Sequence, residues 1–129
     1  MKTLCDSDIL IDFFKKKSSA VELMKDLHKQ GIVAISVLSV AELRVGWTKD
    51  EARELLPHFK KAFQIEPVTF EVAALGGELR REYRNLSGHL LPTIDSLIAA
   101  TALLHTYTLV TRNVKDYAIT GLKHYPLSE

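Results

Sequence analysis

The chain has 129 residues, of which 47% are hydrophobic and 26% charged, with a formal net charge of +1 at pH 7. These values are typical of a globular protein, and the length predicts one domain spanning residues 1–129. No stretch approaches the ~20 apolar residues of a membrane helix, and the N-terminal run lacks the pattern of a signal peptide. Cys5 is the sole cysteine, which excludes an intramolecular disulfide and predicts a reducing, cytoplasmic location.

The first half of the chain alternates short apolar runs with the periodicity of amphipathic helices. The predicted elements are, in order, a strand over residues 3–6, helices over 7–16 and 18–31, a strand over 32–36, and helices over 38–47 and 49–63. Pro57 lies inside the last of these helices, and the sequence leaves open whether it kinks the helix or divides it.

The second half repeats the alternation. Its predicted elements are a short strand over residues 64–68, a helix over 70–85, a loop over 86–92, an almost wholly apolar helix over 93–106, a strand over 107–111 and a weak fifth strand over 121–126. Gly76 and Gly77 fall inside a helix, where each glycine costs ~1 kcal/mol. We therefore expect both glycines to permit close helix packing.

Continuous apolar strands that alternate with helices indicate a parallel sheet covered on both faces. The predicted fold is α/β, a three-layer α/β/α sandwich with a short, mainly parallel central sheet. Ligands of such sheets bind beyond the carboxyl ends of the strands, where the strand order reverses. That edge is where functional residues are expected.

Four acidic residues are placed at this edge by the predicted elements. Asp6 ends the first strand, and Glu42 lies in the first turns of the helix that follows the second strand. Asp95 begins the apolar helix, and Asp116 follows the fourth strand. Their common placement predicts a cluster of carboxylates.

Each acid also has an ordinary structural interpretation. Asp6 could start a helix, and Ser39 with Glu42 has the S-x-x-E spacing of a capping box. Asp95 could complement a helix dipole, and Asp116 could be a turn residue. The nearby acids Asp8 and Asp12 are assigned mostly to capping and to a solvated helix face.

The energetics of the cluster favour a bound cation. Two carboxylates ~5 Å apart repel by about 3 kcal/mol at an effective dielectric of 20, which is large beside a domain stability of ~5–15 kcal/mol. Proton uptake or a cation must relieve this repulsion. Ligands that are all oxygen favour Mg²⁺ or Mn²⁺, and none of the five histidines has the spacing of a zinc pair.

Four motifs carry a resemblance to a known family: LCDSDILID, ISVLSVAELRVG, PTIDSLIAATAL and LVTRNVKDY, in this order between residues 4 and 117. With them the chain resembles a PIN-domain ribonuclease, and more narrowly a VapC-type toxin of a type II toxin–antitoxin pair. The resemblance implies a PIN-like sandwich and an endoribonuclease that hydrolyses RNA phosphodiester bonds with Mg²⁺ or Mn²⁺. The implied products are a 5′-phosphate and a 3′-hydroxyl.

The resemblance also assigns residues. It implies that the catalytic and metal-binding acids are Asp6, Glu42, Asp95 and Asp116, and that the surrounding hydrogen-bonding shell includes Ser7, Thr111 and Asn113. Four positions depart from the family: Ser7-Asp8 replaces a frequent Thr-Asn, Ser96 a common Ala and Tyr117 a common Phe. The extra charge of Asp8 leaves the ligand count open, as it leaves open whether Asn113 or Asp116 lies closer to the metal.

RNA contacts are expected from basic residues. Without the four proposed metal ligands the net charge rises from +1 to +5, so the remaining surface is mildly basic. Arg112, beside the predicted site, and Arg80 and Arg84 are the candidates for phosphate contacts. The lysine clusters at 15–17 and 60–61 are predicted to be solvated helix faces.

The partners implied by the resemblance are a cognate antitoxin and a second copy of the chain in a homodimer. The antitoxin would lay a helix into an apolar groove walled by residues 18–27 and 54–63, and insert a basic side chain among the acids. A phosphoacceptor receiver domain is set aside, because QIEPV lacks the aspartate that such a domain needs after its third strand. The alternative that stays open is a module of the same fold that binds RNA or protein without cleaving.

Overall fold

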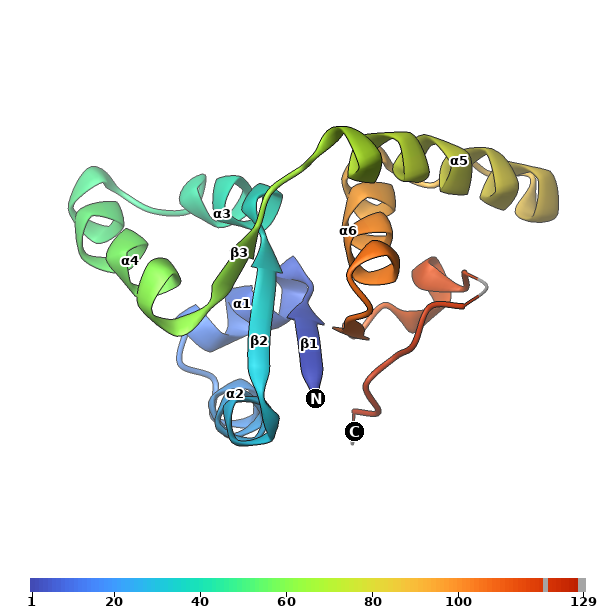
Figure 1. Ribbon diagram of the computed structural model, residues 1–129. Coiled ribbons are helices and arrows are strands. Elements are labelled where there is room, and N and C mark those ends of the chain that lie inside the picture. The colour runs from blue at the N-terminus through green and yellow to red at the C-terminus, as the bar shows by residue number, and fades with distance from the viewer. Residues whose placement is uncertain (120, 128–129) are drawn as a thin grey trace.

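Parallel strands form the centre of the molecule in the computed structural model, which describes residues 1–119 and 121–127 (Figure 1). Its elements are β1 (Lys2–Cys5), α1 (Ser7–Phe14), α2 (Ser18–Gln30), β2 (Ile32–Ser36), α3 (Val37–Arg44), α4 (Lys49–Ala62), β3 (Gln64–Glu66), α5 (Phe70–Ser87), α6 (Thr93–Leu104), β4 (Thr108–Val110) and the 3₁₀ helix η1 (Val114–Tyr117). The four strands follow the order β3-β2-β1-β4.

The sheet has its switch point beside β1. Cys5 is in register with Ile35 of β2 on one side and with Val110 of β4 on the other, so these three strands end at the same edge. From β1 the chain steps outward to β2 and β3, and then returns to place β4 on the opposite side of β1. The segments that follow β1, β2 and β4 therefore converge at one edge, as the sequence predicts.

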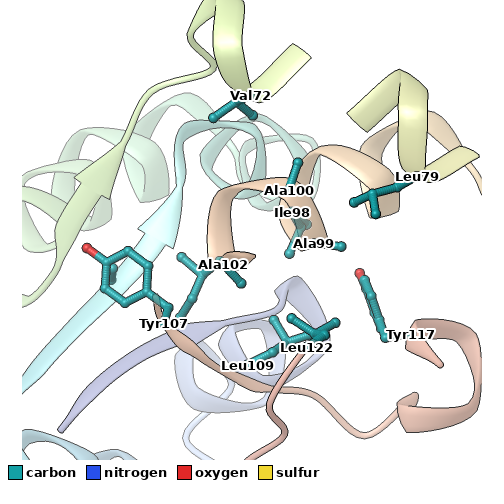
Figure 2. Packing of buried hydrophobic residues seen from close by; sticks show 12 residues of the cluster. Val72, Leu79, Ile98, Ala99, Ala100, Ala102, Tyr107, Leu109, Tyr117 and Leu122 are labelled. Atoms are coloured by element: carbon teal, nitrogen blue, oxygen red, sulfur yellow. The ribbon is translucent and has the colours of Figure 1, made fainter. Parts of the chain in front are cut away.

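The two faces of the sheet carry separate apolar cores, because successive side chains of a strand point to opposite faces. Leu4, Ala34 and Leu109 pack with side chains of α5 and α6. The close view of this core labels Leu109 together with residues of these two helices (Figure 2). Cys5 and Ile35 pack with side chains from α1 to α4. The three-layer α/β/α prediction is confirmed.

Helix α6 is the buried centre of one layer, as its apolar sequence predicts. Ala99, Ala100 and Ala102 are fully buried, and small side chains let neighbouring elements approach closely. At Gly76 an added Cβ would lie 2.9 Å from Cδ2 of Leu97 in α6, so the close packing expected there is confirmed. The expectation for Gly77 is wrong, since an added Cβ would meet no atom within 4 Å in the described structure.

Several local predictions are corrected. Helix α3 begins after Ser36, whose Oγ accepts a hydrogen bond from the Leu38 amide (3.1 Å), so the expected Ser39–Glu42 capping box is absent from this helix start. Of the two alternatives for Pro57, division is excluded, because α4 runs continuously from Lys49 to Ala62. In place of a fifth strand over 121–126, the structure has one isolated bridge between Leu109 and His124.

Within residues 1–119 and 121–127, the structure contains no helix with the combination of length and apolar character that a membrane crossing requires.

Candidate active site

Asp6 stands where β1 meets α1, and its position follows from the sheet. Its amide donates to the Val110 carbonyl (2.9 Å), which continues the pairing of β1 with β4. Its carboxylate accepts from the Ser7 amide through Oδ1 (2.8 Å) and from Thr111 Oγ1 through Oδ2 (2.9 Å). Asp6 is thus the N-cap of α1 and also a buried acid, only 7% exposed, at the switch point.

The charge of Asp6 is poorly solvated. Burial is the main cause that raises the pKa of its carboxyl to about 6, and the charges of Asp8 and Asp95 raise it further. The hydrogen bonds from Thr111 and Ser7 act in the opposite direction without cancelling these effects. At neutral pH the protein therefore holds a carboxylate in a place where its negative charge is costly.

Glu42 reaches the same edge from α3. It is exposed, and its Oε1 accepts a hydrogen bond from Ser7 Oγ at 2.6 Å. Ser7 also hydrogen-bonds the buried Ser39 hydroxyl (2.9 Å), so Ser39 supports the site instead of capping α3. Glu42 is therefore linked through one serine to the residue that follows Asp6.

Asp95 lies in the first turn of α6, and its electrostatic environment ties the four acids together. Its Oδ1 accepts a hydrogen bond from the Tyr117 hydroxyl (3.2 Å). Burial raises the pKa of Asp95, the hydrogen bond from Tyr117 lowers it, and the charges of Glu42, Asp116 and Asp8 raise it again. Charges from three other segments of the chain thus act on the Asp95 carboxyl.

Asp116 lies on η1 and is exposed. Its amide donates to the Asn113 carbonyl (2.9 Å), so the residue also has the turn role considered from the sequence. The neighbouring Tyr117 is buried and holds η1 against the core. Burial raises the pKa of the Tyr117 hydroxyl well above its usual value, and the charges of Asp6 and Asp95 raise it further.

Asp8 and Asp12 do not lie on a solvated face, so that part of the expectation is wrong. The capping part fits Asp8, whose Oδ1 accepts from the Ile9 amide (2.7 Å) in the first turn of α1. Asp8 Oδ2 accepts from the Arg112 amide (3.0 Å) and from Asn113 Nδ2 (3.3 Å). Asp12 is buried, with Oδ2 2.7 Å from Arg112 Nη1 and Oδ1 3.1 Å from Lys17 Nζ. These two acids fasten the loop after β4 to α1. The side-chain amide of Asn113 contacts Asp8, and only its backbone carbonyl contacts one of the four predicted ligands, Asp116.

The three arginines predicted to contact RNA differ in their surroundings. Arg112 is half-exposed but paired with Asp12 and Asp8. Arg80 donates from Nε to the Leu91 carbonyl (2.8 Å), which ties α5 to the segment before α6. Arg84 is exposed near the end of α5. Their predicted contacts with phosphate stay predictions.

Arg112 gives a testable structural prediction. Replacing Arg112 by alanine leaves the buried Asp12 carboxylate with Lys17 alone, and we expect the free energy of unfolding to fall by about 1–2 kcal/mol. Arg53→Ala is the matched control, because Arg53 forms an exposed pair with Asp50 that contributes ~0.5 kcal/mol or less. Urea unfolding measures both, and equal losses would contradict the fastening role.

The chemical type of the acidic side chains suits a hard divalent cation. All the acids offer oxygen ligands, and burial with like-charged neighbours raises the pKa values of Asp6 and Asp95, which a cation would reverse. Among the residues that the structure describes, no three side chains of His, Cys, Asp or Glu lie close enough together to hold a metal ion. Instead, Asp6, Glu42 and Asp95 each accept a hydrogen bond from a side-chain hydroxyl. Glu42 and Asp116 are exposed, so their side chains have room to turn inward.

A three-layer parallel α/β domain with acids gathered at its switch point defines the class of the protein. Within this class, the PIN domain family model matches residues 3–119, and the chain belongs to that family. The predicted membership is confirmed.

Individual relatives agree with the family. The chain is 35% identical over 126 residues to Ribonuclease VapC10 of Mycobacterium tuberculosis, covering 98% of this chain and 87% of the relative. Among solved structures, VapBC2 of Rickettsia felis, bound to a DNA fragment from its promoter, gives a TM-score of 0.83 at 27% identity, with coverage of 99% and 100%. A toxin–antitoxin complex from Klebsiella pneumoniae gives a TM-score of 0.76 at 32% identity, and the match covers 97% of this chain and 99% of the chain in that structure.

Proposed function

We propose that the protein is an endoribonuclease that hydrolyses RNA phosphodiester bonds with a divalent metal ion, Mg²⁺ or Mn²⁺, and that it acts as the toxin of a toxin–antitoxin pair. The observation that carries the proposal is the switch point beside β1, where Asp6, Glu42 and Asp95 each accept a hydrogen bond from a side-chain hydroxyl. Relatives named as VapC ribonucleases, and structural neighbours that are toxin–antitoxin complexes, support it.

The proposed metal ligands are Asp6, Glu42, Asp95 and Asp116. A divalent ion bound there would polarise the phosphate, lower the pKa of a bound water and stabilise the leaving oxygen. Thr111 and Ser7 hold the Asp6 and Glu42 carboxylates through hydrogen bonds of 2.9 and 2.6 Å. Asp95, with its raised pKa, is suited to orient the attacking water or to accept its proton.

The test is cleavage of total cellular RNA by the purified protein. In Mg²⁺ or Mn²⁺ we expect discrete fragments, and with excess EDTA we expect none. Cleavage that is undiminished in EDTA would contradict the metal-dependent mechanism. Intact RNA in every metal would favour the alternative, a PIN-domain module that binds without cleaving.

The proposed binding surface for the antitoxin lies on this protein where the ends of α1, α2 and α4 meet. A hollow of about 340 Å³ is lined mainly by apolar side chains, among them Phe13, Val21, Leu55 and Phe63. A second hollow of about 370 Å³ shares Phe13 and Val21 and continues along α2. We propose that this groove holds an apolar helix of the antitoxin, in agreement with the walls expected from the sequence.

The rim of the groove indicates the chemistry of that helix. Lys16 and His58 line the first hollow, and Lys25, His28 and Lys29 line the second. A helix that carries acidic residues on either side of its apolar stripe would complement this rim. The homodimer implied by the sequence resemblance stays a prediction.

Val21 is the residue to test, because it lines both hollows. We expect Val21→Asp to weaken the complex with the cognate antitoxin at least ~100-fold, since it buries an unpaired charge in the apolar groove. RNA cleavage by the free protein should be unchanged. Leu86→Asp on exposed α5 is the matched control, and its binding should equal that of the wild type. Copurification of Val21→Asp with the antitoxin at wild-type yield would contradict the proposed groove.

A further inference from the structure

Tyr117 places a hydroxyl among the acids from within the apolar core. The residue is 1% exposed, and its ring packs in the core that includes Leu79, Ile98 and Leu122. Figure 2 shows the ring standing beside Leu122, with its oxygen at the end nearer Ala99 and Leu79. That oxygen donates to Asp95 Oδ1 at 3.2 Å.

Packing alone does not account for this hydroxyl. A phenylalanine ring would fill the same space without bringing a polar atom into an apolar core, where an unsatisfied hydroxyl is costly. The hydroxyl is satisfied by a carboxylate at the predicted metal site. The Tyr117 backbone is also held, since its carbonyl accepts from the Ile119 amide (2.7 Å) and lies 3.1 Å from His124 Nε2.

The contact completes a pattern in the site. Thr111 Oγ1 donates to Asp6 (2.9 Å), Ser7 Oγ donates to Glu42 (2.6 Å) and Tyr117 donates to Asp95 (3.2 Å). Each of these acids thus has a hydroxyl donor, which comes from the loop after β4, from α1 and from η1 respectively. The fourth acid, Asp116, is the residue immediately before Tyr117 on η1, so the buried ring also fixes where that acid stands.

We propose that Tyr117 is a positioning residue of the metal site, whose hydroxyl holds the Asp95 carboxylate in the orientation that receives a divalent cation. A phenol is a protonated donor at neutral pH, so it can hold one carboxylate oxygen and leave the other for a ligand. Partners of this kind around metal ligands change metal affinity by ~10–100-fold when they are removed. The inference rests on the proposed function, because it assumes that these acids bind a metal.

The test is the affinity of the metal-free protein for Mn²⁺, measured without RNA by calorimetry or by electron paramagnetic resonance. We expect Tyr117→Phe to weaken Mn²⁺ binding about 10-fold. Tyr107→Phe is the matched control, because it also removes a buried hydroxyl that donates to a carboxylate, Glu66 Oε1 at 2.7 Å, outside the acid cluster. That control should bind Mn²⁺ as the wild type does.

The outcomes separate the inference from the proposed function. Wild-type protein that binds no Mn²⁺ would overturn the metal site and this inference together. Wild-type protein that binds, with Tyr117→Phe binding equally well, would overturn the inference alone. Because Tyr117 is proposed to act through Asp95, Tyr117→Phe in an Asp95→Asn background should weaken binding less than about twofold. An undiminished effect there would contradict action through Asp95.

A second measurement does not depend on the folding of Tyr117→Phe. Fluorotyrosine incorporated into the wild-type chain gives a ¹⁹F signal for each tyrosine, and the Phe variants of the other three assign Tyr117 by elimination. Addition of Mg²⁺ should shift the Tyr117 signal and leave that of Tyr107 in place. A Tyr117 signal that does not move while Mg²⁺ binds would overturn the proposal.

Discussion

Asp95→Asn is expected to reduce RNA cleavage at least ~1,000-fold while the protein stays folded. Asparagine keeps the shape of the side chain and can still accept the hydrogen bond from Tyr117, but it removes the charge that a cation would share with Glu42 and Asp116. A 1,000-fold loss corresponds to ~4 kcal/mol of transition-state stabilisation. Cleavage of total RNA under single-turnover conditions in Mg²⁺ measures it.

Two controls make the Asp95 result specific. Asp26→Asn changes an exposed acid of α2 in the same way and should cleave at the wild-type rate. Asp95→Asn should bind RNA and show a thermal midpoint at least equal to that of the wild type, because the substitution removes like-charge repulsion. Residual cleavage above about one tenth of the wild-type rate would show that Asp95 is a helix residue without a catalytic role.

Asp6→Asn should stabilise the metal-free protein at pH 7 by about 1–2 kcal/mol. The folded-state pKa of Asp6 is about 6, against 3.8 for an unperturbed aspartate, so the folded protein binds this proton more tightly than the unfolded chain does. The stability that comes from the proton is complete below pH ~4 and is lost as the pH rises through ~6. At ~1.4 kcal/mol per pKa unit, the loss is about 3 kcal/mol. Asparagine avoids this loss, but its hydrogen bonds with Ser7 and Thr111 lack the charge of the carboxylate, so the expected net gain is smaller.

Asparagine is a fair replacement because it is also a good N-cap and can accept from the Ser7 amide. Urea unfolding in EDTA between pH 4 and 7.5 should show wild-type stability falling with pH, and a flatter profile for Asp6→Asn. Added Mg²⁺ should narrow or reverse the difference, since a ligand that binds the folded state stabilises it. A variant that is less stable than the wild type at pH 7 would assign Asp6 to capping alone.

The positions of the acids could be predicted from the sequence because they depend on local patterns. Apolar runs mark the strands, and parallel strands with helical crossovers bring their carboxyl ends to one edge, which places Asp6, Glu42 and Asp116. The helix that carries Asp95 is buried in the fold, and its sequence predicts this because it lacks a polar face. Periodicity was sufficient for these features.

Other features depend on contacts between distant residues, which periodicity does not report. The spacing of Asp12 along the sequence is that of a polar helix face, whereas in the fold its carboxylate pairs with Arg112, 100 positions further along the chain. Ser36 and Ser39 are equally good caps by composition, and only the end of β2 decides that α3 begins after Ser36. The departure of Tyr117 from the common Phe was the available signal for its hydroxyl, but its bond to Asp95 required the fold.

The chemistry of the fragment ends tests the central claim most directly. Protein freed of metal by EDTA should leave total cellular RNA intact, and added Mg²⁺ should produce fragments with 5′-phosphate and 3′-hydroxyl ends, which a ligase can join without prior treatment. This result would assign hydrolysis to a metal ion held by the acids at the switch point. Fragments formed in EDTA, with 2′,3′-cyclic phosphate ends, would show attack by the RNA's own hydroxyl and contradict that assignment.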